Sequence, residues 1–472
     1  MFDVIIIGAG SAGLSALREV RKRTDNFLII NAGHWGTTCA RVGCMPSKLL
    51  IEAANAYHRR FSLDEFGITG AQQLRVDSAR VLERVRRLRD EFVAGVRQTT
   101  EKLGNKAVSG RAKLSGPNEI MLDDQLLRAR SIILATGSRP VMPDPWRQYG
   151  SRVLTTDDLF ELETLPKRMA VIGMGAVGLE MAQALARLGV EVTGFGSSEF
   201  LGGLTDSEVN DVARASILDE FQLCLGARAD LVGAAPDGGI VVKADEEAVE
   251  VDYVLAALGR RANLDGLGLE CLGLPLDDKG LPPLDPVLLQ VADLPIFIAG
   301  DVNGSRPLLH EASDDGHIAG LNATAIQKVR FCRRTPLSIV FSSPQIALVG
   351  RTYHELQQAG VDMAIGQVSF ENQGRARSAQ MNRGVLRVYG SNPGGVLLGA
   401  ELCAPAGEHL SHLLALAIER NLTVWDFLRM PFYHPVLEEG LRTALRDLAS
   451  QLPACPESDL AACEPLGCDA LD

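Results

Sequence analysis

The sequence predicts an α/β protein with two doubly wound domains followed by a C-terminal α+β domain. The pattern glycine-x-glycine-x-x-glycine occurs twice, each time between an apolar strand-like run and a helix-like run. From residue 336 onward, strand and helix patterns alternate without such a motif. The chain has 472 residues, of which 46% are hydrophobic and 22% charged. A globular chain of this length is expected to form about two to four domains.

The first glycine motif follows a buried strand predicted over residues 2–7. Its glycines are Gly8, Gly10 and Gly13. Together with the helical pattern that follows, they form a dinucleotide-binding fingerprint: a tight turn, a close approach for a pyrophosphate, and helix–strand packing. The next strand, over 27–30, ends in Asn31, where an acid normally binds the ribose. An asparagine oxygen can still accept a hydrogen bond, so a nucleotide site remains expected.

Cys39 and Cys44 are separated by four residues and precede a helical pattern over 49–57. The partial positive charge of a helix N-terminus stabilises a thiolate, which makes a nearby cysteine reactive. If the turn between them is tight, the two sulfurs can also bond to each other. The alternative is a pair of unrelated core cysteines, because free cysteine is often buried.

Between the two glycine motifs, residues 77–103 have a helical pattern rich in arginine. We interpret these arginines as a solvated helix face; they are Arg80, Arg84, Arg86, Arg87 and Arg89. A strand over 131–134 then enters Thr136 and Gly137. Three prolines within the next eight residues mark a domain boundary.

The second fingerprint follows a strand predicted over 169–172 and precedes a helix over 179–188. Its glycines are Gly173, Gly175 and Gly178. The strand over 190–195 leads to Gly196, where an acid would favour NAD and a nearby arginine NADP. Neither is present, and Ser197 or Ser198 could serve both nucleotides, so NAD is only slightly favoured. Two such sites suggest two different dinucleotides.

Two further strands are predicted after the second motif, and one is followed by a glycine and the other by an acidic residue. A strand over 251–258 leads to Gly259, and one over 295–299 leads to Asp301. Asp301 could face a ribityl chain or a hydroxyl near a phosphate, or it could cap a helix predicted over 308–321. In the C-terminal segment we expect strands over 339–341, 385–389 and 396–402 and helices over 408–420 and 424–428.

His434 and Glu439 lie five residues apart and are joined through Pro435. They could form an oriented histidine–carboxylate pair, which can act as the base for a thiol and the acid for a leaving thiolate. A histidine with a purely structural role is the alternative.

Composition excludes several classes of protein. The net charge of −12 argues against a nucleic-acid or anionic-membrane partner. No apolar stretch is long enough for a transmembrane helix, and no secretory signal is visible at the N-terminus. Nine cysteines in 472 residues are too sparse for a disulfide scaffold, so we expect a cytoplasmic protein with one redox pair.

Taken together, these motifs resemble the pyridine-nucleotide-disulfide oxidoreductases, the family of dihydrolipoamide dehydrogenase, glutathione reductase and mercuric reductase. The resemblance covers residues 2–448, and four separated motifs occur in the order typical of that family. It implies that the first fingerprint binds FAD and the second NAD(P)H. It also implies an obligate homodimer.

The resemblance implies a role for each motif residue. Cys39 would meet the substrate and Cys44 the flavin. Lys48 would lie near flavin N5 with Glu180 as its ion-pair partner, and His434 with Glu439 would form a catalytic dyad across the dimer interface. Asp301 would be a second acid contacting FAD. Further cofactor-binding positions would be Asn31, Thr38, Thr136, Gly137 and Gly259.

The implied activity moves electrons between NAD(P)H, flavin, the Cys39–Cys44 pair and a dithiol or disulfide substrate. Dihydrolipoamide dehydrogenase is the leading expectation, and a glutathione-, mercuric- or thioredoxin-type reductase the alternative. A flavoprotein that binds NAD(P)H without disulfide turnover is an alternative of another class. The expected domains bind FAD (1–150 and 266–335), bind NAD(P) (151–265) and form the dimer (336–450).

The sequence departs from the family pattern in several places. Asn31 replaces an acid, Gly36-Thr37-Thr38 stands where a double glycine is typical, and Val436 follows His-Pro where threonine is usual. An acidic tail over 451–472 contains a second cysteine pair with the same spacing, Cys463 and Cys468. This pair could pass electrons to a substrate, or its thiols could be incidental.

Overall fold

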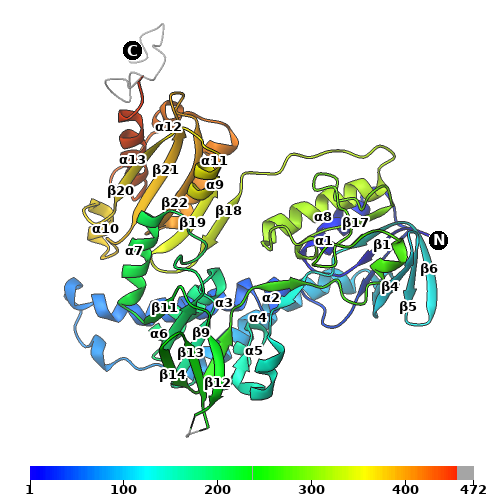
Figure 1. The fold of residues 1–472 in the computed structure, drawn as a ribbon, viewed down its shortest axis with the longest axis horizontal. Helices are drawn as coiled ribbons and strands as arrows, with labels where there is room; N and C mark the ends of the chain where they lie inside the picture. Colours follow the sequence, from blue (N-terminus) through cyan, green and yellow to red (C-terminus); the bar gives the residue numbers. More distant parts are fainter. Residues whose placement is uncertain (236–237, 454–472) are drawn as a thin grey trace. The chain divides into compact units, whose positions relative to one another are not determined.

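The structure, a computed structural model, describes residues 1–235 and 238–453. These residues fold into two compact units. Unit 1 contains residues 1–50, 77–165 and 258–333, and unit 2 contains the described residues of 51–76, 166–257 and 334–453. Figure 1 shows the course of the chain through these elements. The predicted cysteine pair of the tail lies outside the described residues.

Unit 1 is built on a mostly parallel sheet with the strand order β3-β2-β1-β6, and β17 also pairs with β6. β5 and β4 extend this sheet as antiparallel strands. Because the strands of a parallel sheet are buried on both faces, they are nearly continuous runs of Ile, Val and Leu. The helices α1 and α8 pack against each other beside this sheet (Figure 1).

The elements of unit 1 follow the chain in three segments. They are β1 (Phe2–Ile7), α1 (Ser11–Val20), β2 (Phe27–Asn31), α2 (Thr38–Arg41), α4 (Ser78–Glu101), β3 (Ala107–Ser109), β4 (Ala112–Gly116), β5 (Glu119–Leu122), β6 (Gln125–Leu134), β7 (Ser138–Pro140), β8 (Val153–Leu154), α5 (Thr156–Leu159), β16 (Arg260–Ala262), β17 (Ile296–Ile298) and α8 (Leu309–Thr324). α3 (Cys44–His58) begins in unit 1 and ends in unit 2.

Unit 2 contains a second parallel arrangement, in which β11, β10, β9 and β15 lie in that order. Its first part comprises β9 (Arg168–Ile172), α6 (Ala176–Arg187), β10 (Glu191–Gly196), α7 (Ser207–Leu218), β11 (Gln222–Leu225), β12 (Asp230–Ala234), β13 (Ile240–Ala244), β14 (Glu247–Val251) and β15 (Tyr253–Ala256). The sheet order reverses next to the first strand, β9, which is where doubly wound sheets bind nucleotides.

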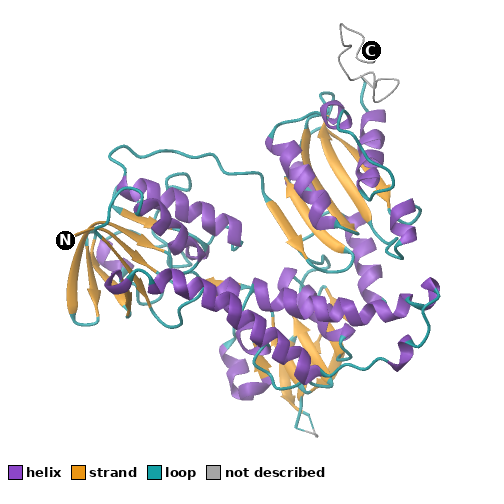
Figure 2. Ribbon diagram, turned by 180° about the vertical axis from the view of Figure 1, so that it is seen from behind, coloured by secondary structure: helices purple, strands orange, loops and turns teal. Residues whose placement is uncertain are grey.

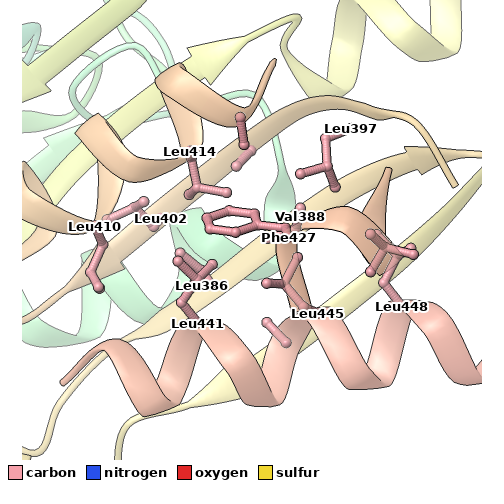
Figure 3. Packing of buried hydrophobic residues seen from close by; sticks show 14 of the residues in the cluster. Leu386, Val388, Leu397, Leu402, Leu410, Leu414, Phe427, Leu441, Leu445 and Leu448 are labelled. Atoms are coloured by element: carbon pink, nitrogen blue, oxygen red, sulfur yellow. The ribbon is translucent and has the colours of Figure 1, made fainter. Parts of the chain in front are cut away.

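The second part of unit 2 is an antiparallel sheet with the order β18-β19-β22-β21-β20, with helices around it (Figure 2). Its elements are β18 (Leu337–Val340), β19 (Gln345–Gly350), α9 (Tyr353–Gln358), β20 (Met363–Ser369), α10 (Gly374–Ser378), β21 (Val385–Ser391), β22 (Leu397–Ala404), α11 (Gly407–Glu419), α12 (Val424–Leu428) and α13 (Glu438–Ser450). Leu441, Leu445 and Leu448 of α13 pack with Phe427 and strand residues in one buried cluster (Figure 3).

Two expectations about local structure are wrong. The strand predicted over 251–258 is two strands, because β14 ends at Val251 and β15 begins at Tyr253. Asp252 separates them, and its carboxylate accepts hydrogen bonds from the backbone and the guanidinium of Arg168. The continuous apolar run over 253–258, directly after Asp252, concealed this turn.

The arginines of α4 do not all lie on a solvated face. Arg89 is 8% exposed and forms ion pairs with Asp90 and Glu161. Arg86 donates hydrogen bonds to the backbone carbonyls of Phe160 and Leu162. These two arginines therefore attach α4 to the segment around α5. Among the described residues, no helix combines the length and apolar composition that crossing a bilayer requires.

Candidate active site

The first glycine turn connects β1 to α1, as the sequence predicts. A Cβ at Gly8 would lie 2.2 Å from the carbonyl oxygen of Ala135, and one at Gly13 would lie 1.9 Å from that of Gly8. Protein packing therefore requires both glycines. A Cβ at Gly10 would meet no atom within 4 Å. Open space beside a glycine at the start of a helix is what a bound pyrophosphate needs.

The second glycine turn, between β9 and α6, repeats this arrangement. A Cβ at Gly178 would lie 1.7 Å from the carbonyl oxygen of Gly173. Gly173 has a φ of +107°, close to the +108° of Gly8. A Cβ at Gly175 would again meet no atom within 4 Å. Both turns thus offer a helix N-terminus that an anion can approach.

Asn31 ends β2 beside the first turn. Its Oδ1 accepts a hydrogen bond of 3.1 Å from the backbone N–H of Ala9. Its Nδ2 donates to the carbonyl oxygen of His34. The asparagine that replaces the usual acid therefore holds the glycine turn against the end of the strand. The amide oxygen has two lone pairs, so a second hydrogen bond to it remains available.

Asp301 begins a short 3₁₀ turn that follows β17 after Ala299 and Gly300. The predicted helix after it starts only at Leu309, and its N-cap position is Leu308, so Asp301 is not the cap of that helix. The Ser138 hydroxyl donates a 2.6 Å hydrogen bond to the Asp301 carboxylate. Arg260 in turn donates to the hydroxyl and carbonyl oxygens of Ser138. The carboxylate is thus held in a fixed chain of polar groups.

The other predicted cofactor positions of unit 1 lie around this chain. Thr136 and Asn263 bind each other twice: the Thr136 hydroxyl donates to the Asn263 carbonyl oxygen, and the Asn263 amide donates to the Thr136 carbonyl oxygen. Gly137 and Gly259 both have positive φ, +68° and +89°. Neither has an atom within 4 Å of the Cβ it lacks. The two glycines are therefore needed for their backbone conformation.

Cys39 lies in α2, and Cys44 is the first residue of α3, so the pair is at the start of a helix, as predicted. Gly43 makes the turn between them tight. A Cβ there would stand 3.2 Å from the Cα of Cys39 and 3.2 Å from the carbonyl oxygen of Thr38. Thr38, which is exposed, is the first residue of α2, and the Thr37 hydroxyl caps that helix. Both cysteines are thiols in this structure.

The sequence predicts a reactive cysteine at this helix N-terminus, and that remains a prediction. The hydrogen bond with Cys44 and then burial raise the pKa of Cys39 well above its usual range, and Lys48 opposes this only weakly. Such a thiol needs a base to become a nucleophile.

Lys48 and Glu180 lie in different units, on α3 and α6. Glu180 is 5% exposed, and one of its oxygens accepts a 3.0 Å hydrogen bond from the backbone N–H of Phe341. The backbone of the first residue after β18 therefore holds the glutamate in position. Its predicted pairing with Lys48 remains a prediction.

His434 and Glu439 form the predicted pair at the start of α13. His434 Nδ1 lies 3.0 Å and 3.1 Å from the two carboxylate oxygens of Glu439. The hydrogen bond from His434 lowers the pKa of Glu439, and the backbone N–H of Val436 contributes to this. The His434 side chain is 80% exposed. Because Nδ1 is bound by the carboxylate, Nε2 is the ring nitrogen that another group could bind.

The sequence reasoning missed Ser138 and Arg260, which hold Asp301 in place. A signal existed for both of them. Ser138 follows Thr136-Gly137 at the carboxyl end of a parallel strand, and Arg260 follows Gly259 in the same kind of position. Loops at those strand ends form the ligand sites of doubly wound sheets, so polar residues there are candidates.

Comparison with known proteins gives two family matches. Residues 2–316 match the pyridine nucleotide-disulphide oxidoreductase family, and residues 337–445 match the dimerisation domain of that family. The dihydrolipoyl dehydrogenase of Bacillus subtilis is 32% identical over 449 residues, which cover 93% of this chain and 94% of that protein. The dihydrolipoyl dehydrogenase of Thermus scotoductus is 31% identical over 461 residues, covering 95% and 98%.

Solved structures share the fold. The HOCl-induced flavoprotein disulfide reductase RclA from Escherichia coli, in its Cu(II) complex, has a TM-score of 0.81 at 22% identity. The match covers 94% of this chain and 98% of that one. LpdA from Mycobacterium tuberculosis has a TM-score of 0.81 at 24% identity, covering 94% and 99%. At this level of identity the likeness establishes the architecture alone.

Proposed function

Because this chain belongs to the pyridine nucleotide-disulphide oxidoreductase family, we propose that it exchanges electrons between a nicotinamide nucleotide and a dithiol or disulfide through Cys39 and Cys44. It is a flavoprotein disulfide reductase of the dihydrolipoyl dehydrogenase type. Its cofactors are FAD and NAD(P), which supply the hydride chemistry when bound. The proposal concerns which residues act and on which substrate.

The glycine turns fit the two nucleotides. In unit 1, the open space at Gly10 and the helix N-terminus behind it would receive the FAD pyrophosphate. Asp301, fixed by Ser138, would accept a hydrogen bond from a hydroxyl of FAD. The remaining FAD contacts are proposed for Gly8, Gly13, Asn31, Thr38, Lys48, Thr136 and Gly137. In unit 2, Gly175 has the same open space, and Gly173 and Gly178 complete the proposed NAD(P) turn. Gly259, in unit 1, is a further proposed cofactor-binding position.

The observation that carries the proposal is the pair of thiols at a tight turn, in which the hydrogen bond with Cys44 and burial raise the pKa of Cys39. A thiol whose pKa is raised needs a base before it can attack a disulfide, and a leaving thiolate needs an acid. His434, oriented by Glu439, supplies both functions through Nε2. Cys39 would then be the thiol that meets the substrate, and Cys44 the thiol that faces the flavin. Lys48 and Glu180 would hold the flavin side of the pair.

The dimerisation domain indicates a homodimer. A catalytic histidine that is 80% exposed in one chain is what a site completed by a second copy requires. We therefore place His434 and Glu439 opposite Cys39 of the partner. Dihydrolipoamide is the proposed substrate, since both relatives described above are dihydrolipoyl dehydrogenases. The cytoplasm is the proposed location, because the cysteines are sparse.

The test is an anaerobic titration of the FAD-loaded enzyme with NADH, followed by absorbance. After two electrons, a long-wavelength charge-transfer band should develop, and Cys44→Ser should abolish it. In parallel, dihydrolipoamide with NAD⁺ should turn over faster than glutathione disulfide or a thioredoxin-type protein disulfide with NADH or NADPH. Bleaching without the band would contradict the Cys39–Cys44 assignment. Faster turnover of another disulfide would replace dihydrolipoamide as the substrate.

A further inference from the structure

The two glycine turns share one geometry, so their strand-end positions can be matched atom by atom. The backbone N–H of Gly8 donates a 2.7 Å hydrogen bond to the carbonyl oxygen of Ile30, and that of Gly173 donates one of 2.7 Å to Phe195. Asn31 and Gly196 are therefore equivalent positions, each directly after the residue that accepts this bond. In dinucleotide sites this position reads the 2′ group of the adenine-side ribose.

The two turns differ in the residue that packs beside this strand-end position. The residue between the first two glycines is Ala9 in one turn and Met174 in the other, and both are buried. A Cβ at Gly194 would lie 2.8 Å from the Met174 sulfur. A Cβ at Gly196 would lie 3.3 Å from Met174 Cβ and 2.9 Å from Leu225 Cδ2. Met174 thus packs across β10, and the strand is glycine at both positions that it covers.

Neither Gly194 nor Gly196 has a positive φ, so space and not backbone conformation requires glycine there. A carboxylate that selects NADH by accepting a hydrogen bond from the ribose therefore cannot stand at residue 196 without displacing Met174 or Leu225. The neighbouring Ser197 and Ser198 are exposed and uncharged. The Ser198 Oγ accepts a hydrogen bond from Phe200 N–H, which leaves its own hydrogen for a ribose hydroxyl or a phosphate.

Charge near this position is balanced. Glu199 is paired with Arg214 at 3.4 Å, so the loop presents neither an unpaired arginine for a 2′-phosphate nor an unpaired acid against it. We infer that Met174 makes the NAD(P) site of this enzyme accept both nucleotides, with Ser197 and Ser198 as the residues that contact the 2′ group. This inference rests on the proposed function, because it concerns the nucleotide that delivers the hydride.

The test is the affinity of the FAD-loaded enzyme for NAD⁺ and NADP⁺, measured separately by isothermal titration calorimetry. The two dissociation constants should agree within about tenfold, a difference that one charged contact would exceed. A larger ratio in either direction would overturn the inference. Ser198→Arg should then tighten NADP⁺ by about tenfold and leave NAD⁺ unchanged, because arginine pairs with a phosphate. Ser151→Arg, at an exposed serine in unit 1, is the matched control.

A second variant tests the packing itself. Gly196→Ala should weaken both nucleotides together, because the added Cβ displaces Leu225 or Met174, while the FAD content stays the same. If Gly196→Ala binds both nucleotides like the wild type, position 196 is not closed and the inference fails. Flavin reduction distinguishes a failure of the proposed function from a failure of this inference. If neither NADH nor NADPH reduces the flavin, the proposed function fails, whereas strong selection of one nucleotide overturns only the inference.

Discussion

Cys403 shows how burial makes a thiol unreactive, in a protein whose proposed chemistry depends on other thiols. It lies on β22 with 1% of its surface exposed, and burial raises its pKa to about 12. Alkylation requires the thiolate. Because the pKa is raised, Cys403 stays protonated at all pH values below about 12 as long as the fold persists.

We therefore expect iodoacetamide at pH 8 to leave Cys403 unlabelled in the native enzyme and to label it after denaturation. Peptide mass spectrometry reads out each site separately. The exposed Cys332 is the internal control and should be labelled in the native state. Native labelling of Cys403 at the rate of Cys332 would show that β22 opens far more readily than its burial implies.

His434 is the residue whose replacement should separate the two halves of the reaction. General acid–base groups contribute roughly 10²–10⁴-fold to a rate. His434→Gln should therefore lower disulfide turnover by about a hundredfold or more. The rate of flavin reduction by NADH in a stopped-flow instrument should remain at the wild-type value. Equal loss in both measurements would mean that His434 supports the fold or the flavin and not the proton transfer.

At the scale of elements, Glu401 connects β22 to the start of α7. Its carboxylate has no exposed surface and accepts hydrogen bonds from the backbone N–H groups of Thr205, Asp206 and Tyr353. Asp206 caps α7 and also binds Arg387 and the hydroxyl of Tyr389. This buried polar network fixes the nucleotide-binding part of unit 2 to its C-terminal sheet.

Glu401→Gln keeps the side-chain volume but replaces one acceptor oxygen by an NH₂ donor, so buried N–H groups lose their partner. Leaving such a group unpaired costs about 1–3 kcal/mol. We expect the free energy of unfolding to fall by about 2 kcal/mol, measured by urea denaturation with circular dichroism. Glu247→Gln, on an exposed position of β14, should leave it unchanged. A wild-type midpoint for Glu401→Gln would show that solvent reaches this network.

The sequence predicted an element correctly where residues next to it in the chain mark where the element begins or ends. The strand over 2–7 and the helix over 424–428 agree with β1 and α12, since a glycine turn ends one and the Thr423 capping box begins the other. The break at Asp252 and the buried Arg89 were not predictable, because each depends on partners distant in sequence. The glycine turns could be predicted because their motif is contiguous in the sequence. The packing of Met174 across β10 could not, because it depends on residues that only the fold brings together.

At the scale of the whole molecule, the proposed site belongs to two chains. Cys44→Ser and His434→Gln homodimers should each retain about a hundredth or less of the wild-type disulfide turnover. Mixed dimers carry both changes in one site and none in the other. Random mixing of the two variants should then restore roughly a quarter of the wild-type turnover, because half of the dimers are mixed and each has one intact site. No recovery would place both residues of one site in the same chain.

The exposure of His434 has a consequence for how the enzyme behaves on dilution. If a second copy completes the site, the concentration of the protein itself acts as an activator by mass action. When the protein concentration is lower than the dissociation constant of the dimer, disulfide turnover per molecule should decrease. Hydride uptake by the flavin should not fall, if the two glycine turns of one chain suffice to bind both nucleotides. Dilution would thus convert a disulfide reductase into a flavoprotein that accepts electrons from NADH and cannot pass them to a disulfide.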